Sequence, residues 1–346
     1  MRRYILKRLL LIIPTLIGIM TLNFFIIQAT PGGPVEQMIA RLEGIGAQGE
    51  VSHSSSVYKN QGLDEAMIAK INALYGFDKP LATRYFLMIK NYLCFEFGDS
   101  FYKNTPVVNL LLEKLPVSIS LGLWSTLLIY LISIPLGIRK ALKDGSTFDS
   151  ITSTFIIIGN AIPIFLFALI LIIFFASGTY FNLFPLRGIV GDNFESLSLF
   201  GKIKDYFWHI TLPVISLSIG GFATLTLLSK NSFLEEIHKQ YVKLAFAKGL
   251  NESQVLYRHI FRNAMLIIIA SIPSALLGML LSGSLLIEII FSLDGLGLLG
   301  YESIITRDYP VIFGSLYLFT LLGLIITLMS DLLYTLIDPR INFQQA

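Results

Sequence analysis

The chain has 346 residues, of which 54% are hydrophobic and 14% charged, with a formal net charge of +3 and a mean hydropathy of +0.70. Soluble domains carry about 25% charged residues, so this composition excludes an ordinary soluble protein and predicts an integral membrane protein. Cys94 is the only cysteine, which excludes an intrachain disulfide and a cysteine-ligated metal cluster.

The N-terminus combines basic residues with a long apolar run. Arg2, Arg3, Lys7 and Arg8 precede the run from Leu9 to about Ala29. This run is too long for the apolar region of a signal peptide, and no small-residue cleavage site follows it. Residues 1–29 are therefore predicted to form a tail and a first transmembrane helix with a cytoplasmic N-terminus.

Residues 30–116 form a more polar segment, which we predict to be a helical periplasmic insert. Gly44 to Gly62 is rich in glycine and serine and predicts a loop. Leu63 to Tyr75 and Arg84 to Phe95 have the spacing of amphipathic helices. Strand signals are too few to predict a sheet.

Residues 117–346 contain five further apolar runs and are predicted to form the core of the protein. Each run is long enough to cross the hydrocarbon of a bilayer as a helix. Pro135, Pro163 and Pro273 lie inside three of them and are expected to kink these helices without ending them. The runs are Val117 to Ile138, Ile151 to Ala176, Thr211 to Ser229, Leu266 to Ile290, and Val311 to Ile337.

The distribution of lysine and arginine predicts the orientation of these spans. With the N-terminus inside, the short cytoplasmic segments hold Arg2, Arg3, Lys7, Arg8, Arg139, Lys140, Lys143, Lys230, Lys239, Lys243, Lys248, Arg258, Arg262 and Arg340. The short segments on the other side hold Arg187, Lys202, Lys204 and Arg307. By the positive-inside rule, both termini and the loop 230–265 are expected in the cytoplasm.

The loop 230–265 is the strongly charged segment between two long apolar runs. Apolar residues recur at helical spacing in its first half, at Phe233, Ile237, Tyr241, Leu244 and Ala245. Gly249 then predicts a helix stop, and Asn251 with Gln254 predicts a capping box at the start of a second helix. This pattern is typical of a docking element at the membrane surface, but it also fits an ordinary amphipathic loop.

Residues 241–249 (YVKLAFAKG) and 259–264 (HIFRNA) resemble the signature loop of ABC importer permeases, in the form typical of the dipeptide and oligopeptide branch. Lys243 and Leu244 replace the Glu and the first Ala of the general family pattern, whereas Ala245 and Gly249 match it. Further landmarks of peptide permeases are Pro31 to Pro34, Gly76 to Pro80, Phe97 to Ser100, Pro116 to Ser118, Arg307 to Val311 and Asp338 to Arg340. Gly32 to Val35 and Trp208 to Pro213 look closest to the Yej-type permeases, a type associated with import of oligopeptides and microcin C.

The resemblance implies an all-α membrane protein with the six-helix type I ABC importer permease (MetI-like) fold, in the bacterial inner membrane. It implies one half of a heterodimeric pore, with a homologous second permease, one or two cytoplasmic ABC ATPase subunits, a periplasmic substrate-binding protein and a peptide substrate as partners. Neither nucleic acid nor a cofactor on this chain is expected, and ATP would be used by the partner subunit. The residues expected to couple to the ATPase are Tyr241, Val242, Lys243, Leu244, Ala245, Ala247, Lys248, Gly249, Arg262 and Asn263.

No pattern in the sequence predicts an energy source or an enzyme within this chain. It has no phosphate-binding loop, no serine nucleophile elbow and no His-Glu-x-x-His zinc motif. The alternatives are an ion-coupled secondary carrier that would use Glu288 or Asp331, a scaffold without transport, and an ABC permease for nickel or another small solute.

The stretch 291–310 predicts a bent outer turn, because Gly295, Gly297 and Gly300 lie within it. Glu288, Asp294, Arg307 and Asp308 lie in or beside this turn and are possible gate or pathway residues. A structural role also fits them: Glu288 could be an interfacial residue that reaches the outer surface or accepts a helix-end hydrogen bond, and Arg307 and Asp308 could form a local pair within a simple turn.

Overall fold

A computed structural model describes residues 2–29, 79–103, 105–178, 180–282 and 285–337. In these ranges the chain is helical, with an isolated bridge between Asp99 and Pro106 and no β-strand. The predicted all-α class is therefore confirmed. The loop 44–62, the helix 63–75 and the landmark 338–340 lie outside the described residues.

Among the described residues, five helices are long and apolar enough to cross a membrane. They are α1 (Arg2–Ala29), α5 (Val107–Leu142), α8 (Leu199–Ile237), α11 (Phe261–Ser282) together with the short elements before it, and α14 (Tyr309–Ile337). Pro135 lies inside α5 and Pro273 inside α11, so both helices continue past their prolines as expected. The apolar run predicted to reach Ile290 holds two helices, because α12 (Leu285–Ile290) is separate from α11.

The prediction of one kinked span over 151–176 is wrong about the size of the bend. The structure has α6 (Thr147–Ala161) and α7 (Ile164–Phe175), which meet at 97°. Proline disfavours the helical conformation of the residue before it, and Ile162 is extended, with φ −78° and ψ 121°. The pair therefore forms a broken span or a re-entrant segment, and six crossings result if it counts as one.

The chain forms two compact units, and one of them contains residues 6–112 and 300–321. Aromatic side chains hold this unit together: the rings of Tyr92 and Phe97 lie 4.9 Å apart, and those of Phe97 and Tyr317 lie 5.3 Å apart. Thr21 in α1 shares a hydrogen bond of 2.7 Å with Tyr85 in α4 (Leu81–Leu93).

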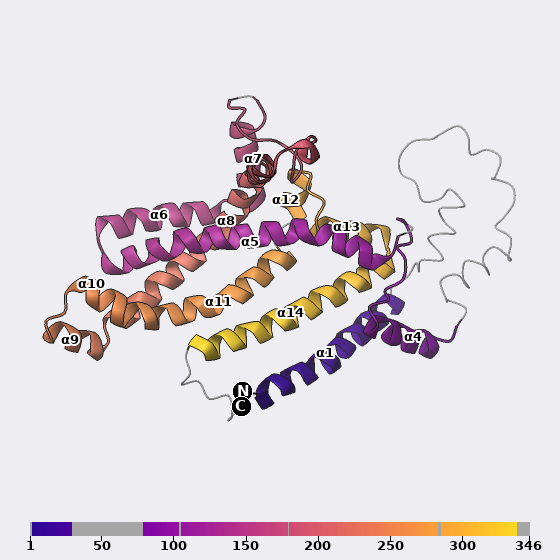
Figure 1. Ribbon diagram of the computed structural model, residues 1–346, viewed down its shortest axis with the longest axis horizontal. Helices are drawn as coiled ribbons and strands as arrows, with labels where there is room; N and C mark the ends of the chain where they lie inside the picture. Colours follow the sequence, from indigo (N-terminus) through magenta and orange to yellow (C-terminus); the bar gives the residue numbers. More distant parts are fainter. Residues whose placement is uncertain (1, 30–78, 104, 179, 283–284, 338–346) are drawn as a thin grey trace. The chain divides into compact units, whose positions relative to one another are not determined.

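The other unit contains residues 1–5, 113–299 and 322–346 and carries the predicted loop. Figure 1 shows α5 and α6 running side by side, with α9 (Gln240–Ala247) and α10 (Glu252–Val255) at the end where α8 passes into α11. A π-helical turn (Leu256–Ile260) joins α10 to α11. A buried cluster that includes Phe233, Val242 and Val255 lies beneath this end of the unit. This unit also contains a 3-10 turn (Phe194–Ser196) and the first residues of α13 (Leu296–Thr306), whose residues from Gly300 onward belong to the first unit described.

Candidate functional site

Gly249 ends α9 because its backbone takes a conformation that other residues rarely adopt. Its φ is +84°, its N–H donates to the carbonyl of Phe246 at 2.9 Å, and the N–H of Leu250 donates to the carbonyl of Ala245 at 3.3 Å. These two bonds form a Schellman motif. A Cβ added at Gly249 would meet nothing within 4 Å. Within this chain, the glycine is required for its conformation and not for close packing.

The second short helix begins as predicted, with a capping box. The side-chain oxygen of Asn251 accepts from the N–H of Gln254 at 2.8 Å, and the side chain of Gln254 accepts from the N–H of Asn251 at 3.2 Å. Both bonds satisfy N–H groups that a helix start leaves without a partner. Adjacent helix-stop and helix-start motifs therefore fix the direction of the chain between α9 and α10.

Helix α9 has one face in the core and one face in the open. Val242 and Ala245 are buried and pack in the cluster around Phe233. The opposite side, which we call the α9 outer face, consists of exposed residues: Lys243, Leu244, Phe246, Ala247 and Lys248. Val242 and Ala245 thus support the helix from inside, and the α9 outer face presents apolar and cationic groups together. Sequence reasoning missed Phe246, since an apolar helix residue is more often assigned to the core.

A small polar network fastens α9 to the ends of the two long helices. The hydroxyl of Tyr241 donates to Glu236 at 2.5 Å and accepts from the side-chain amide of Asn263 at 3.2 Å. Lys239 also binds the Glu236 carboxylate. Glu236 is buried at the end of α8, Asn263 and Arg262 lie exposed in the first turn of α11, and Ser232 in α8 donates to the carbonyl of Ala264 at 2.7 Å.

The network stabilises the protonated forms of Lys239 and Tyr241. The hydrogen bond to Glu236 raises the pKa of Lys239, and burial, with the same carboxylate, raises the pKa of Tyr241. Since both pKa values lie above their ordinary values, Lys239 stays charged and Tyr241 keeps its hydroxyl proton at neutral pH. Glu236 was not predicted, because a single acidic residue at a helix end gives no signal without its partners.

A buried ion cluster lies at the same end of the unit. The ammonium of Lys140 is fully buried, 2.8 Å from a carboxylate oxygen of Asp149, and it also donates to Thr152 and Ser153 in α6. Lys230 in α8 lies 2.7 Å from Asp149 and 2.7 Å from Asp144. Buried charges are stable only when paired in this way. The cluster therefore joins α5, α6 and α8 next to the α8–α11 loop.

The predicted gate residue Glu288 is fully buried and bonded inside its own unit. Its carboxylate accepts from the N–H of Leu298 at 2.6 Å and from the Ser118 hydroxyl at 3.4 Å. Ser118 in turn accepts from the N–H of Leu296 at 2.9 Å. Since Leu296 begins α13, the side chains of Glu288 and Ser118 both cap this helix. This is the helix-end bond that the structural interpretation of Glu288 expected.

The other three predicted gate residues lie in turns. Asp294 forms a 2.5 Å ion pair with Lys114, within the same unit as Glu288. Asp308 belongs to the other unit, is buried, and accepts from the Ser100 hydroxyl at 2.5 Å and from the N–H of Phe101 at 3.2 Å. Arg307 is half-buried and has a φ of +54°, which marks the bend before α14. The positions of these three residues do not test a role in gating, which stays a prediction.

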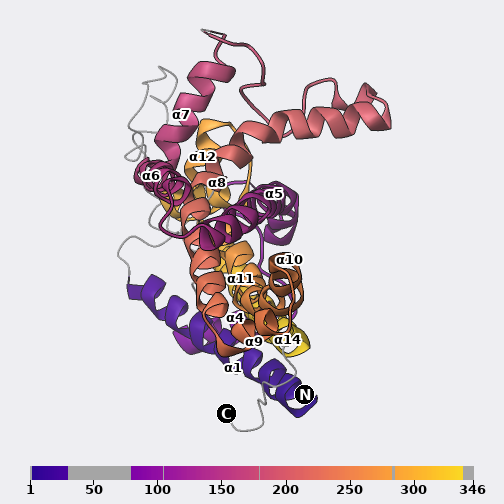
Figure 2. The same cartoon turned by 90° about the vertical axis from the view of Figure 1, so that its left-hand side faces the viewer.

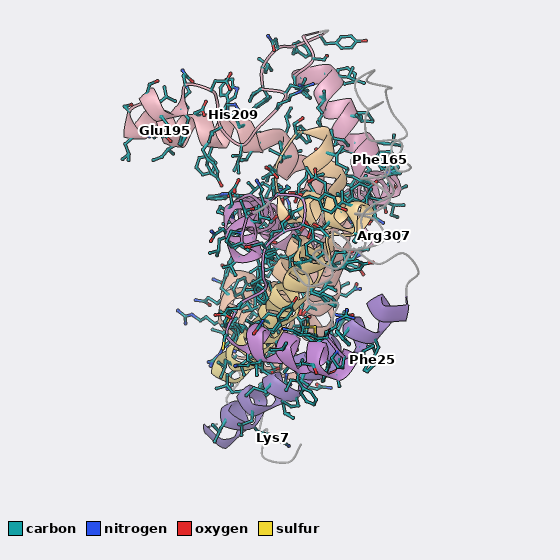
Figure 3. The ribbon with its side chains drawn as sticks, turned by 90° about the vertical axis from the view of Figure 1, so that its right-hand side faces the viewer. Lys7, Phe25, Phe165, Glu195, His209 and Arg307 are labelled. Carbon is teal, nitrogen blue, oxygen red and sulfur yellow. The ribbon has the colours of Figure 1, made fainter. Side chains whose placement is uncertain are left out.

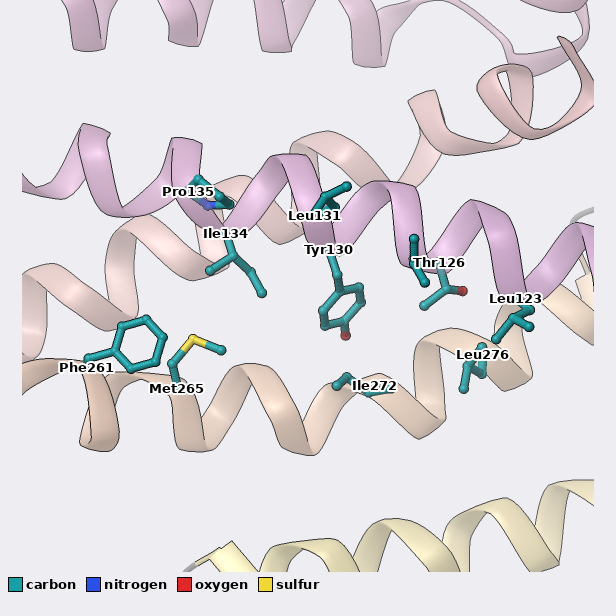
Figure 4. A pocket seen from close by; sticks show the side chains of 11 residues that line it. Leu123, Thr126, Tyr130, Leu131, Ile134, Pro135, Phe261, Met265, Ile272 and Leu276 are labelled. Atoms are coloured by element: carbon teal, nitrogen blue, oxygen red, sulfur yellow. The ribbon is translucent and has the colours of Figure 1, made fainter. Parts of the chain in front are cut away.

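A groove of about 570 Å³ runs between α5 and α11 (Figure 4). Tyr130 and Thr126 supply the polar side-chain atoms of its lining, and the hydroxyls of Tyr130 and Ser271 share a 2.7 Å hydrogen bond. Its other lining residues are apolar, so the groove offers no charged group to a solute. Among the residues that the structure describes, no group of three or more His, Cys, Asp or Glu side chains could hold a metal ion.

Several apolar crossings, a rigid helix–glycine–helix loop between two of them and buried ionic anchors define a membrane transport subunit of the permease class. The chain belongs to the family described as binding-protein-dependent transport system inner membrane component, which it matches over residues 133–343. It is therefore a multi-pass inner-membrane permease subunit of an ABC importer, and it has no ATPase site of its own.

The chain is similar over its whole length to named permeases. It is 57% identical to the inner membrane ABC transporter permease protein YejB of Escherichia coli O157:H7, over 99% of this chain and 100% of the relative. It is 55% identical to the peptidoglycan transport system permease protein YejB of Agrobacterium fabrum, over 100% of this chain and 99% of the relative. It is 34% identical to the oligopeptide transport system permease protein AppB of Bacillus subtilis, over 99% of this chain and 100% of the relative.

A solved structure supports the fold. A chain of the MetNI methionine ABC transporter, in an inward-facing conformation, matches with a TM-score of 0.52 and 16% identity, over 67% of this chain and 97% of that chain. The MetI-like fold expected from the resemblance is confirmed by this likeness.

Proposed function

We propose that this chain forms one half of a heterodimeric pore that imports peptides, and that the α9 outer face docks on a cytoplasmic ABC ATPase. The partners are a homologous second permease, one or two ATPase subunits that use ATP, and a periplasmic substrate-binding protein. The excess of lysine and arginine supports a cytoplasmic position for the α8–α11 loop and for both termini.

The observation that carries the docking proposal is the contrast between the two faces of α9. Leu244 and Phe246 are 57% and 46% exposed, although Val242 and Ala245 on the opposite face of the helix are buried in the core. Exposed apolar side chains on a rigid element mark protein contacts, and the flanking Lys243 and Lys248 suit an acidic rim. Because a rigid α9 moves with α8 and α11, closure of the ATPase pair would shift these two spans and change the side to which the pore opens.

Co-purification of the tagged protein with its ATPase tests this docking. Leu244→Glu combined with Phe246→Glu should abolish recovery of the ATPase, while insertion in the membrane and recovery of the second permease persist. Leu142→Glu is the matched control, because Leu142 is 53% exposed at the cytoplasmic end of α5 but lies outside α9. Full recovery of the ATPase by the double variant would overturn the docking proposal.

Peptides are the proposed substrate class because relatives at 34% and 30% identity carry the names of oligopeptide and dipeptide transport proteins. The relative named as a peptidoglycan transport protein, at 55% identity, favours peptide-bearing cell-wall fragments as a second candidate. Microcin C-like peptides are a third candidate, which rests on the Yej-type resemblance. Competition between a labelled oligopeptide and each of these compounds, in vesicles that contain the whole complex, separates the three. Ion-driven uptake by the chain alone, without ATP, would contradict the proposal.

A further inference from the structure

Helix α8 is longer than a bilayer crossing requires. Its 39 residues correspond to about 58 Å at 1.5 Å per residue, whereas the hydrocarbon core is about 30 Å thick. Part of the excess lies at the end that carries Lys230 and Glu236. The rest lies before Pro213, where the helix begins, and residues 199–209 are here called the arm.

The arm runs across the direction of the neighbouring spans. In Figure 1, α5 and α6 lie lengthwise, and in Figure 2, which looks along them, the first part of α8 extends sideways from these two helices. Figure 3 shows Glu195 and His209 along this projecting segment. The arm therefore lies along the plane of the membrane if α5 crosses it.

One side of the arm is fastened to its own unit. The carboxylate of Asp205 accepts from the N–H of Gly191 at 2.7 Å. The indole of Trp124 in α5 donates to the Tyr206 hydroxyl at 2.9 Å. These bonds fix the rotation of the arm about its axis.

The other side of the arm is apolar and largely exposed, although the ring of Phe207 also packs against that of Trp124 in α5, with 4.8 Å between their centres. Leu199, Ile203 and Phe207 follow one another at four-residue spacing, and Phe200 lies beside them. Leu199 is 81% exposed and Phe200 is 78% exposed. Water is an unfavourable neighbour for such large apolar side chains, so this face favours an apolar environment.

The borders of this face carry the side chains typical of a membrane–water interface. The ammonium of Lys204 lies 6.0 Å from the centre of the Trp208 ring, and Lys202 lies 5.1 Å from the Phe194 ring and pairs with Glu195 at 3.0 Å. Trp and Tyr are enriched at this boundary, and lysine reaches the headgroups while its stem stays in apolar surroundings. Cationic borders also complement anionic phospholipid headgroups.

We propose that the arm is an interfacial membrane anchor, with Leu199, Phe200 and Ile203 among the acyl chains of the outer leaflet and Lys204 at the headgroups. The occupant of this face is lipid because the arm is continuous with a membrane-spanning helix, lies across the spans and has interfacial residues at its borders. The anchor holds the outer end of α8 in place, so that movement of the α8–α11 loop acts on a helix fixed at its other end. The choice of the outer leaflet rests on the orientation in the proposed function.

Spin-label accessibility in lipid nanodiscs that hold the whole importer tests this anchor. Cys94→Ser removes the only cysteine, and Phe200→Cys, Ile203→Cys and Glu195→Cys each place one nitroxide. Labels at 200 and 203 should collide with oxygen, which dissolves in lipid, and be shielded from a water-soluble nickel chelate. The matched label at 195 should show the reverse, since the Glu195 side chain is 93% exposed beside the arm.

Two results would overturn the anchor. Access of the nickel chelate to 200 and 203 equal to that at 195 would place the face in water. Shielding of 200 and 203 from both reagents would mean that a protein subunit covers it. The side of the membrane on which the arm lies is measured separately in sealed vesicles. If the chelate reaches the label at 195 only from the ATPase side, the proposed orientation is refuted. The contact of the arm with lipid is decided independently by the labels at 200 and 203.

Discussion

The α8–α11 loop and the turn that precedes α13 both depend on a glycine, but for different physical reasons. Gly249 has a φ of +84° and open space around its missing Cβ. Gly295 has an ordinary backbone, but a Cβ there would collide with the buried carboxylate of Glu288. The first glycine therefore serves the shape of the chain, and the second serves close packing on a polar group.

The same contrast extends to the charged and apolar groups near each glycine. Around Gly295 the carboxylate of Glu288 is fully buried, and its hydrogen bonds with Leu298 and Ser118 lie within the unit. Around Gly249 the apolar Leu244 and Phe246 are exposed, although Val242 and Ala245 on the opposite face of α9 are buried. Polar groups that are buried and hydrogen-bonded inside the protein contribute to its stability. Apolar side chains that stay exposed on a rigid helix are available to bind a partner protein. Substitutions should separate these two effects.

The largest expected effect is that of Glu288→Ala on stability. This change leaves the N–H of Leu298 without its carboxylate acceptor in a buried site, and we expect a loss of about 3 kcal/mol in the free energy of unfolding. Denaturant unfolding in detergent measures it. Glu302→Ala is the control, because Glu302 is half-exposed and its 3.5 Å pair with Lys103 lies at the surface. Equal stability of the two variants would contradict the capping role of Glu288.

Gly295→Ala should lower the free energy of unfolding by about 2 kcal/mol, since the added methyl group displaces the Glu288 carboxylate from its hydrogen bonds. The double variant Gly295→Ala with Glu288→Ala should be more stable than the sum of the two losses predicts, because the collision no longer exists. The measurement is a double-mutant cycle from the same unfolding curves. Strict additivity would show that Gly295 is required for another reason.

The short motifs of this protein could be read from the sequence because their causes are local. The break at Gly249 and the capping box at Asn251 each depend on residues within a few positions, and both occur as predicted. The approximate positions of the spans followed from the length of the apolar runs. By contrast, Pro163 predicted a kink, whereas the 97° turn between α6 and α7 depends on what each helix packs against.

The roles of the polar residues were harder to predict because their partners are distant in sequence. Ser118 lies 170 positions from Glu288, and Ser100 lies 208 positions from Asp308. No spacing rule joins such pairs. Glu236 lies 5 positions from Tyr241, but its place in the network also depends on Asn263 from the next span. The sequence alone therefore could not distinguish a gating role from a structural role for the carboxylates of Glu288 and Asp308.

Substitutions at Gly249 should affect transport far more than stability. Gly249→Val places a branched side chain at a residue with positive φ, and this backbone conformation then costs about 1–2 kcal/mol. The chain is therefore expected to leave α9 in a different direction. We expect it to abolish ATP-driven uptake while the protein still inserts in the membrane. Gly249→Asn should keep most uptake, since Asn tolerates this conformation. Loss of uptake in both variants would mean that a partner approaches this position too closely for any side chain.

The smallest expected effect is that of Tyr241→Phe, which keeps the ring and removes the hydroxyl between Glu236 and Asn263. A hydrogen bond to a charged group contributes about 1.5–3 kcal/mol, but Lys239 still pairs with Glu236, so we expect a loss of about 1 kcal/mol. Uptake per ATP hydrolysed should fall slightly, because α9 is then held to α8 by fewer bonds. Tyr257→Phe is the control, since Tyr257 is exposed in the π-helical turn and lies outside the network. If Tyr241→Phe leaves both the unfolding curve and the coupling ratio unchanged, the buried face of α9 alone orients the helix, and the polar network is not needed for it.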